Sequence, residues 1–394
     1  ELGEKIYNNP ELGYKEEFAT KEVAKEMKEI GLEVEEGLAV TGCKGVLEGK
    51  GDGPSLAVMG ELDAVICGEH PDADPETGAV HACGHNIQTA AMVGAAYALA
   101  GNGIMDNLSG NINFMAVPAE EYVELEYRSN LRDKGEITYL GGKQEMIKRG
   151  ELDDIDMAMM IHTLDLKNKK VLIGPDGNGF VGKKVKFVGK ESHAGGAPEE
   201  GINALNAAML AINNINAQRE TFPDDERIRV HPIITKGGDI VNIVPADVRM
   251  ESYVRGRTID GLMSANKKVN RALKAGGIAV GADVEINDMP GYLPLKNNTE
   301  LDQLFNENSL NFVSEDEIEN GASFTGSFDF GDVTHLMPGL HPFVGGVEGD
   351  LHTREFKIVD PEEAYILPAK IMALTIIDLL YNKAEKANEI ISNF

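Results

Sequence analysis

Apolar positions along the chain recur at either helical or strand spacing. Helices are predicted at 16–30, 87–100 and 364–380, and short apolar runs that predict buried strands lie at 56–59, 111–117 and 157–161. Between residues 87 and 100 almost every side chain is apolar and many are Ala, which is typical of a helix buried on all sides. This alternation of strands and helices favours an α/β fold.

Acidic and histidine side chains follow the predicted strands. Asp63 comes shortly after the first run, the pair Glu120-Glu121 follows the second, and His162 follows the third directly. In open α/β sheets, functional sites form outside the carboxyl ends of the strands. The pattern therefore predicts a doubly wound sheet with a polar site along one edge.

The pattern changes in the middle of the chain. There it reads strand, helix, strand, strand, helix, strand, with strands at 183–188, 227–234, 248–254 and 283–286 and helices at 202–215 and 259–275. That order predicts a small inserted α+β domain with an antiparallel sheet. Because 394 residues exceed what one core usually supports, we expect a doubly wound α/β domain from 1–177 and 292–394 and an insert at 178–291.

The charge balance disfavours several classes of partner. Lys and Arg total 37 against 65 Asp and Glu, a net charge of −28. So acidic a surface repels nucleic acid and anionic lipid. We also expect no membrane span, since no window approaches the roughly 20 apolar residues required, and no signal peptide. The chain has 3 cysteines, a number that fits a reducing cytoplasm better than a disulfide framework.

The stretch "HACGHN" from His81 places a thiol and imidazoles within a few residues of each other. Five side chains with metal-binding atoms follow predicted strands or lie in Gly-rich turns: Cys83, His85, Glu121, His162 and His352. Thiolate, imidazole and carboxylate are the donors that bind Zn²⁺ and similar ions. From spacing alone, a metal site and ordinary hydrogen-bonded side chains stay open as alternatives. A cysteine nucleophile is disfavoured, because no His and Asn or Asp arrangement surrounds Cys83.

A series of motifs in fixed order extends over nearly the whole chain. They are "NPELGYKE" from Asn9, "GELDAV" from Gly60, "HACGHN" from His81, "PAEE" from Pro118, "IHT" from Ile161, "SHAG" from Ser192, "VNIVPA" from Val241, "VRGRT" from Val254 and "LHTREF" from Leu351. With them the sequence resembles the aminoacylase and carboxypeptidase family of metallopeptidases, in the branch of N-acyl amino acid amidohydrolases. It looks closest to p-aminobenzoyl-glutamate hydrolase and to the hippurate and indole-acetyl-amino-acid hydrolases.

The resemblance implies a role for each matching side chain. Ligands of a two-metal centre would be Cys83, His85, Glu121, His162 and His352. Glu120 would be the general base, and Asp63 would orient the site. The ions would be Zn²⁺ or Mn²⁺, with Co²⁺ or Ni²⁺ possible. Two divalent ions against one thiolate and one carboxylate would leave the site net positive.

The resemblance also implies that the insert is a lid through which the chain forms a homodimer or higher homo-oligomer. His193, Asn242 and Arg255 of the insert would bind the substrate carboxylate and the developing oxyanion. The reaction implied is hydrolysis of the amide bond of an N-acyl or N-aminoacyl amino acid. The alternatives are a dipeptidase or carboxypeptidase on the same scaffold and a non-catalytic, metal-dependent peptide-binding protein. Asn86, where the branch usually has Asp, leaves the choice of substrate open.

Overall fold

The structure, a computed structural model, describes residues 1–101 and 103–394. Contacts divide the described chain into two compact units. The first unit comprises Glu1–Asp176, Lys296–Ser323 and Asp332–Phe394, and the second comprises Gly177–Leu295 and Phe324–Gly331. The second unit thus includes Phe324–Gly331, a short segment well beyond the stretch predicted as the insert.

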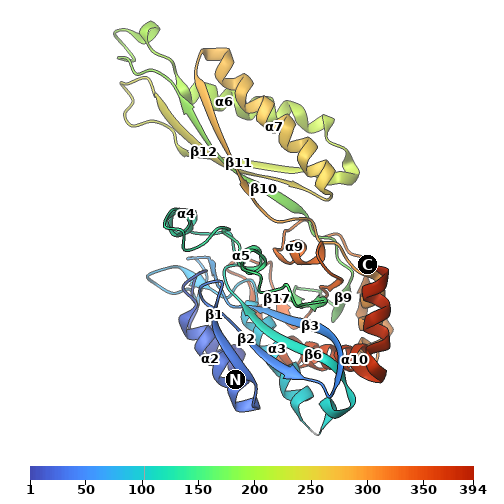
Figure 1. Ribbon diagram of the computed structural model, residues 1–394. Coiled ribbons are helices and arrows are strands. Elements are labelled where there is room, and N and C mark those ends of the chain that lie inside the picture. The colour runs from blue at the N-terminus through green and yellow to red at the C-terminus, as the bar shows by residue number, and fades with distance from the viewer. Residues whose placement is uncertain (102) are drawn as a thin grey trace. The chain divides into compact units, whose positions relative to one another are not determined.

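A mixed sheet forms the centre of the first unit (Figure 1). Its order is β1 (Glu33–Leu38), β2 (Gly42–Glu48), β6 (Ser109–Val117), β3 (Gly51–Glu61), β7 (Met157–Met159) and β15 (Gly339–Leu340). β3 pairs in parallel with both β6 and β7, whereas β1 and β2 run antiparallel at one edge. The three strands predicted to deliver polar residues are therefore neighbours whose carboxyl ends share one edge.

The remaining elements of the first unit are helices and short strands. The helices are α1 (Leu2–Tyr7), α2 (Glu17–Ile30), α3 (His85–Ala100), α4 (Leu125–Asp133), α5 (Gly142–Arg149), α8 (Thr299–Ser309) and α10 (Leu367–Asn393), while α9 (Phe330–Thr334) begins in the second unit. A smaller sheet has the order β14 (Ile318–Asn320), β9 (Val171–Ile173), β16 (Phe343–Val344) and β8 (His162–Thr163). Two separate two-stranded sheets pair β4 (Val65–Ile66) with β5 (Ala79–Val80) and β17 (Val347–Glu348) with β18 (Lys357–Ile358).

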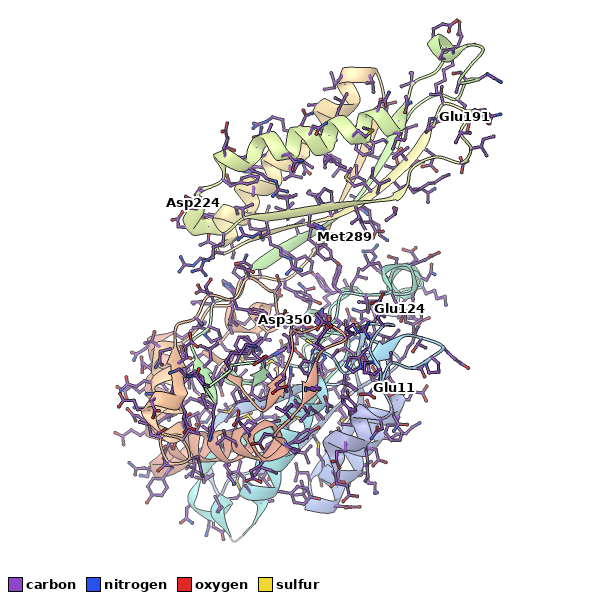
Figure 2. All side chains as sticks on the ribbon, turned by 180° about the vertical axis from the view of Figure 1, so that it is seen from behind. Glu11, Glu124, Glu191, Asp224, Met289 and Asp350 are labelled. Atoms are coloured by element: carbon purple, nitrogen blue, oxygen red, sulfur yellow. The ribbon has the colours of Figure 1, made fainter. Side chains whose placement is uncertain are left out.

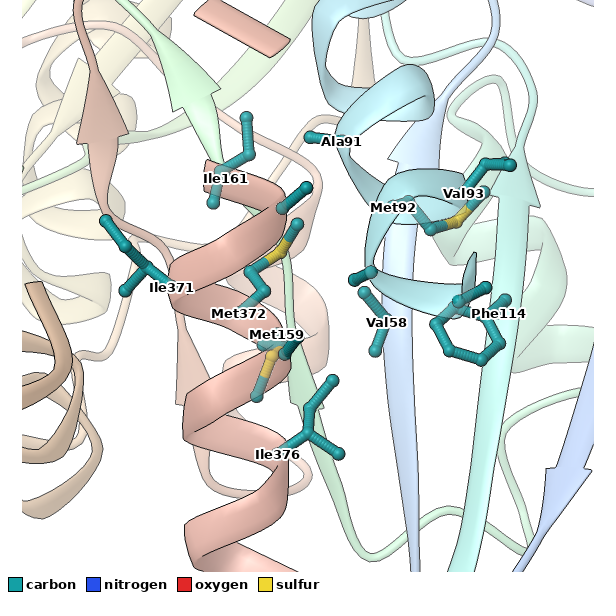
Figure 3. Close-up of a cluster of buried hydrophobic side chains, with 14 of the residues drawn as sticks. Val58, Ala91, Met92, Val93, Phe114, Met159, Ile161, Ile371, Met372 and Ile376 are labelled. Atoms are coloured by element: carbon teal, nitrogen blue, oxygen red, sulfur yellow. The ribbon is translucent and has the colours of Figure 1, made fainter. Parts of the chain in front are cut away.

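The core of the first unit lies where α3 and α10 pack on the central strands. Figure 3 shows Val58, Phe114 and Met159 of the strands beside the apolar side chains of both helices. Of α3, eleven residues from His85 to Leu99 are buried, as its apolar composition predicts. Burying this helix fixes its first residue, His85, against the sheet edge.

The last helical stretch corrects one expectation. Residues 362–393, a π-helical turn at Glu362–Ile366 followed by α10, are long and apolar enough by length and composition to cross a membrane. However, 61% of the most apolar stretch of this segment is buried in the fold, and Ile371, Met372 and Ile376 belong to the core (Figure 3). Packing in the core explains the apolar face of this helix.

The second unit has the predicted order strand, helix, strand, strand, helix, strand. Its antiparallel sheet has the order β11 (Arg229–Lys236), β12 (Asp247–Gly256), β10 (Gly179–Val188) and β13 (Asp283–Pro290), and α6 (Ala204–Gln218) and α7 (Ile259–Val280) cover one face of it (Figure 1). Side chains of both helices and the strands form a core separate from that of the first unit. The predicted α/β class with an inserted α+β part is confirmed.

Candidate metal centre

Neighbouring strand ends bring the predicted site residues together. Asp63 follows β3, Glu120 and Glu121 follow β6, and His162 begins β8 just beyond β7. Asp63 joins two of these elements, because its Oδ2 accepts a hydrogen bond from the Glu121 N–H at 2.9 Å. All four side chains are buried.

Left-handed backbone conformations occur at the turns that carry the site. Gly84 has φ 80°, and a Cβ there would lie 2.2 Å from Cγ2 of Thr163. Ala119 (φ 54°) and His352 (φ 62°) adopt the same region although they are not glycines. Such conformations cost of order 1–3 kcal/mol and cluster where function requires a fixed side-chain direction.

Among the described residues, three groups of side chains have donor atoms close enough to hold a metal ion. They are Cys83, His85 and His162; Cys83, Glu121 and His352; and Glu61, His85 and Glu120, with all donor atoms of a group within 4.8 Å of one another. Cys83 belongs to two groups. A thiolate shared in this way can bridge two ions, so the geometry fits a two-metal site.

Cys83, Glu121 and His352 form the most exposed part of the cluster. His352 Nε2 lies 3.2 Å from Cys83 Sγ and 2.9 Å from Glu121 Oε1, and the His352 side chain is 47% exposed. Burial and Glu121 raise the pKa of the Cys83 thiol, but the imidazoles of His352, His85 and His162 outweigh them and lower it to about 6. The thiolate, which is the form that binds metal, is therefore favoured at neutral pH.

Hydrogen bonds orient both buried imidazoles. His85 Nδ1 lies 2.8 Å from the backbone oxygen of Asp63, and His162 Nδ1 lies 2.8 Å from that of Thr163. Carbonyl oxygens only accept, so Nδ1 carries the proton of each neutral ring, and Nε2 is the nitrogen that would bind a metal. A second partner that fixes the ring in this way is the usual companion of a metal-binding histidine.

Buried donor atoms without partners provide a test of whether metal ions fit. Three buried donor atoms face only other members of the cluster and form no hydrogen bond among the described residues: His85 Nε2, Glu61 Oε2 and Glu121 Oε1. Leaving such atoms unsatisfied is costly. Divalent ions would satisfy all three, so the residues present fit the group that the sequence predicts.

The charge of the site differs from the expectation of one thiolate and one carboxylate. Glu61, Asp63 and Glu120 are also buried there, and two buried cations lie against them. Lys143 Nζ donates to Glu61, and Arg128 Nη2 lies 4.0 Å from Asp63 Oδ2. With two divalent ions bound, the site would be only slightly positive, so the expected sign holds with a smaller magnitude.

Sequence reasoning missed Glu61, Lys143 and Arg128. Glu61 stands two positions before Asp63, and side chains at that spacing lie on the same face of an extended segment, so the motif "GELDAV" held the signal. Nothing local marks the other two, which reach the site only through the packing of residues 122–150. The Asn86 side chain contacts none of the proposed ligands through its amide, which donates to Gly3 O and Tyr365 Oη.

His193 and Asn242 lie together in the second unit. The Ala194 N–H donates to Asn242 O, and His193 Nδ1 accepts the N–H groups of Gly195 and Gly196. Since Nδ1 accepts, Nε2 of His193 is the protonated nitrogen and a donor.

Arg255 lies toward the opposite end of the same unit. Arg255 pairs in register with Phe180, at the start of β10, whereas His193 follows Val188 at its end. Eight residues of antiparallel strand separate those ends by about 27 Å. Figure 2 shows Glu191, two residues before His193, and Asp224, five residues before β11 begins, at opposite ends of the second unit. Within one chain, His193 and Arg255 therefore do not meet.

Comparison with known proteins now decides the family. The model of peptidase family M20/M25/M40 matches residues 57–378. This chain belongs to that family. It is therefore a hydrolase of the metallopeptidase type, as the motifs predicted.

Similar proteins differ in what they hydrolyse. The human Xaa-Arg dipeptidase is 34% identical over 328 residues, covering 79% of this chain and 68% of that protein. The IAA-amino acid hydrolase ILR1-like 4 of Arabidopsis thaliana is 27% identical over 355 residues, covering 86% and 75%. The crystal structure of a dinuclear metal-binding M20 peptidase from Bacillus subtilis shares the fold, with a TM-score of 0.73, 22% identity and 96% of each chain covered.

Proposed function

We propose that this member of the family hydrolyses the amide bond of N-acyl or N-aminoacyl amino acids, with Glu120 as the general base. The observation that carries the proposal is the position of Glu120: it is buried, and its Oε2 lies 3.9 Å from His85 Nε2, within the donor group of Glu61 and His85. Glu121 belongs instead to the group with Cys83 and His352. The two adjacent carboxylates thus lie beside different groups of donor atoms.

The residues of the chain would divide the work as follows. Cys83, His85, Glu121, His162 and His352 would hold two divalent ions, Zn²⁺ or Mn²⁺ in our proposal, with Co²⁺ or Ni²⁺ as other candidates. Bound there, the ions would lower the pKa of water and polarise the amide carbonyl. Glu120 would accept a proton from the attacking water and donate it to the leaving amine. Asp63 would keep His85 and the Glu121 backbone in place.

A dipeptidase acting on a cationic C-terminal residue is the second candidate. It is favoured by an acidic hollow of about 700 Å³ in the first unit. Its lining includes Asp165, three residues after His162, and Asp350, two residues before His352 (Figure 2), together with Glu348, Glu355, Asp360 and Glu363. One cation, Lys167, also lines the hollow and pairs with Asp165, so the other carboxylates provide its excess negative charge. Such a surface suits a guanidinium or ammonium group, as the name of the human relative suggests.

A substrate panel tests the proposal. The purified protein, loaded with Zn²⁺ or Mn²⁺, is incubated with N-acetyl, N-benzoyl and N-(4-aminobenzoyl) amino acids and with dipeptides ending in Arg, Lys or Glu, and free amine is measured. We expect release that a chelator abolishes and a divalent ion restores. Preference for dipeptides ending in Arg or Lys would support the second candidate. Full activity after metal removal would overturn both, and metal binding without any hydrolysis would indicate a peptide-binding protein.

We also infer that the chain forms a homodimer through the second unit. β11 is an edge strand, and Ile233 and Ile234 on it are 51% and 39% exposed. An open edge with apolar side chains is suited to pairing with another strand.

Because Cys83 must stay a free thiolate to bind metal, a reducing compartment such as the cytoplasm is the proposed location.

A further inference from the structure

Glu61, the last residue of β3, has a buried carboxylate with two different neighbours. Its Oε1 accepts a hydrogen bond from Lys143 Nζ, and the Lys143 side chain is fully buried. Its Oε2 lies 3.1 Å from His85 Nε2 and has no hydrogen-bond partner in the described part of the chain. One oxygen is thus held by a cation while the other is left facing an imidazole.

The backbone of Glu61 is held by the helix that carries His85. The Glu61 N–H donates to Gln88 Oε1 at 3.3 Å, and Glu61 O accepts from Thr89 Oγ1 at 2.6 Å. Both partners lie in the first turn and a half of α3, which begins at His85. The carboxylate and the imidazole are therefore fixed relative to each other before any ligand binds.

Two electron-pair donors face each other across this short distance. When the ring is neutral, His85 Nδ1 holds the proton toward Asp63, and Nε2 presents a lone pair to Glu61 Oε2. Such atoms repel unless a proton or a cation lies between them. Ligands bonded to one ion at about 2.0–2.2 Å are about 2.8–3.6 Å apart, depending on the angle at the ion, and this range includes the observed separation.

We propose that Glu61 is a further metal ligand, which binds through Oε2 the ion held by His85, and that Lys143 is the residue that positions it. This inference rests on the proposed metal centre. It adds a carboxylate outside the ligand set that the family resemblance implies. It also explains why a lysine is buried there: Lys143 takes up Oε1 and leaves one oxygen for the ion.

The first test measures metal binding without reference to activity. The wild type should bind two ions per chain by metal analysis. In Glu61→Gln, affinity for one ion, measured by competition with a chelator, should fall by about 10–100-fold or more, while the other ion stays bound. Glu145→Gln is the matched control: this carboxylate is also buried and paired with a cation, Arg149, but it contacts none of the proposed ligands. Wild-type affinity in Glu61→Gln would overturn the proposal.

Substitution of Lys143 separates a positioning role from a purely structural ion pair. In Lys143→Met the Glu61 carboxylate loses its buried partner, which is destabilising. If Glu61 binds an ion, the loss in melting temperature should be larger for the metal-free protein than for the metal-loaded one. Equal losses in both forms would show that the pair only stabilises the fold.

Two further measurements apply if Glu61→Gln does not fold. The double variant Glu61→Gln/Lys143→Met leaves no unpaired charge and should show the same loss of affinity for one ion. Crystals of the wild type soaked in Zn²⁺ need no substitution at all. A Glu61 oxygen within about 2.2 Å of an anomalous peak supports the proposal, and one beyond hydrogen-bonding distance overturns it. A wild type that binds no ion would instead overturn the proposed function.

Discussion

At the scale of single residues, the site depends on how neighbouring carboxylates are separated by their surroundings. Glu121 lies near His352, whose imidazole counters the effect of burial, so that the pKa of Glu121 is lowered to about 2. Its neighbour Glu120 belongs to the group around His85. Two adjacent residues of the same type can therefore perform different tasks.

Exchanging each carboxylate for its amide tests this division. Glu120→Gln preserves shape but removes the base, so turnover should fall by roughly 10²–10⁴-fold while metal content stays near normal. Glu121→Gln should lower metal content, because it removes a donor beside Cys83 and His352. Steady-state kinetics and metal analysis on both variants provide the check. The reverse pattern would exchange the two roles.

Outside the site, the buried Asp302 of α8 makes the stability of the fold depend on pH. Burial raises its pKa from 3.8 to about 7. The folded chain then binds this proton more tightly than the unfolded chain, so stability falls as the pH rises from about 4 to about 7. Asp302→Asn should raise the free energy of unfolding at pH 8 by on the order of 1–3 kcal/mol and have little effect at pH 4. Urea titrations measure this, with the exposed Asp154→Asn as the control.

At the scale of elements, close packing of loops against helix ends positions the site. α5 begins at Gly142, whose N–H donates to Ala119 O at 3.1 Å, next to Glu120. The same helix carries Lys143. The chain between Glu121 and His162 thus acts as a support that places a cation behind the strand ends.

A methyl group at Gly142 should disturb this support. The added Cβ would lie 1.6 Å from Pro118 O, a backbone atom that cannot yield without moving the turn before Glu120. Gly142→Ala should therefore lose about 1–3 kcal/mol of stability and bind metal less tightly. Gly68→Ala, where a Cβ meets nothing within 4 Å, should change neither quantity. Denaturant unfolding and metal titration compare the two, and an unaffected Gly142→Ala would contradict this role.

At the scale of the whole molecule, two units with separate cores carry different parts of the predicted chemistry. The donor cluster lies in the first unit, and His193, Asn242 and Arg255 lie in the second. Because about 27 Å of strand separates the ends near His193 and Arg255, both can serve one substrate only if they come from different copies of the chain.

Mixing two inactive variants tests that arrangement. Glu120→Gln and His193→Ala chains are combined under conditions that allow protomers to exchange. If His193 acts across a two-fold interface, each heterodimer has one site with both defects and one with neither, and about a quarter of all sites regain activity. If His193 serves its own chain, every site keeps a defect. Exchange shown by labelled subunits without recovered activity would exclude the role between subunits.

The sequence by itself determined the elements and the edge at which the site forms. Periodicity and strand ends are local properties, so the strands before Asp63, Glu120 and His162 could be recognised from short windows. The order of elements in the second unit followed in the same way. The motif around Cys83 and His85 indicated metal, and family membership confirmed the class of enzyme.

Only the tertiary structure decided which side chains share an environment. Glu61 meets Lys143 across 82 positions, and no local pattern encodes a contact that depends on how α5 packs against β3. The separation of His193 from Arg255 likewise follows from strand register rather than from their motifs. Packing also showed that the last helix belongs to the core. Composition tells only how apolar a segment is, whereas its burial depends on the elements that surround it.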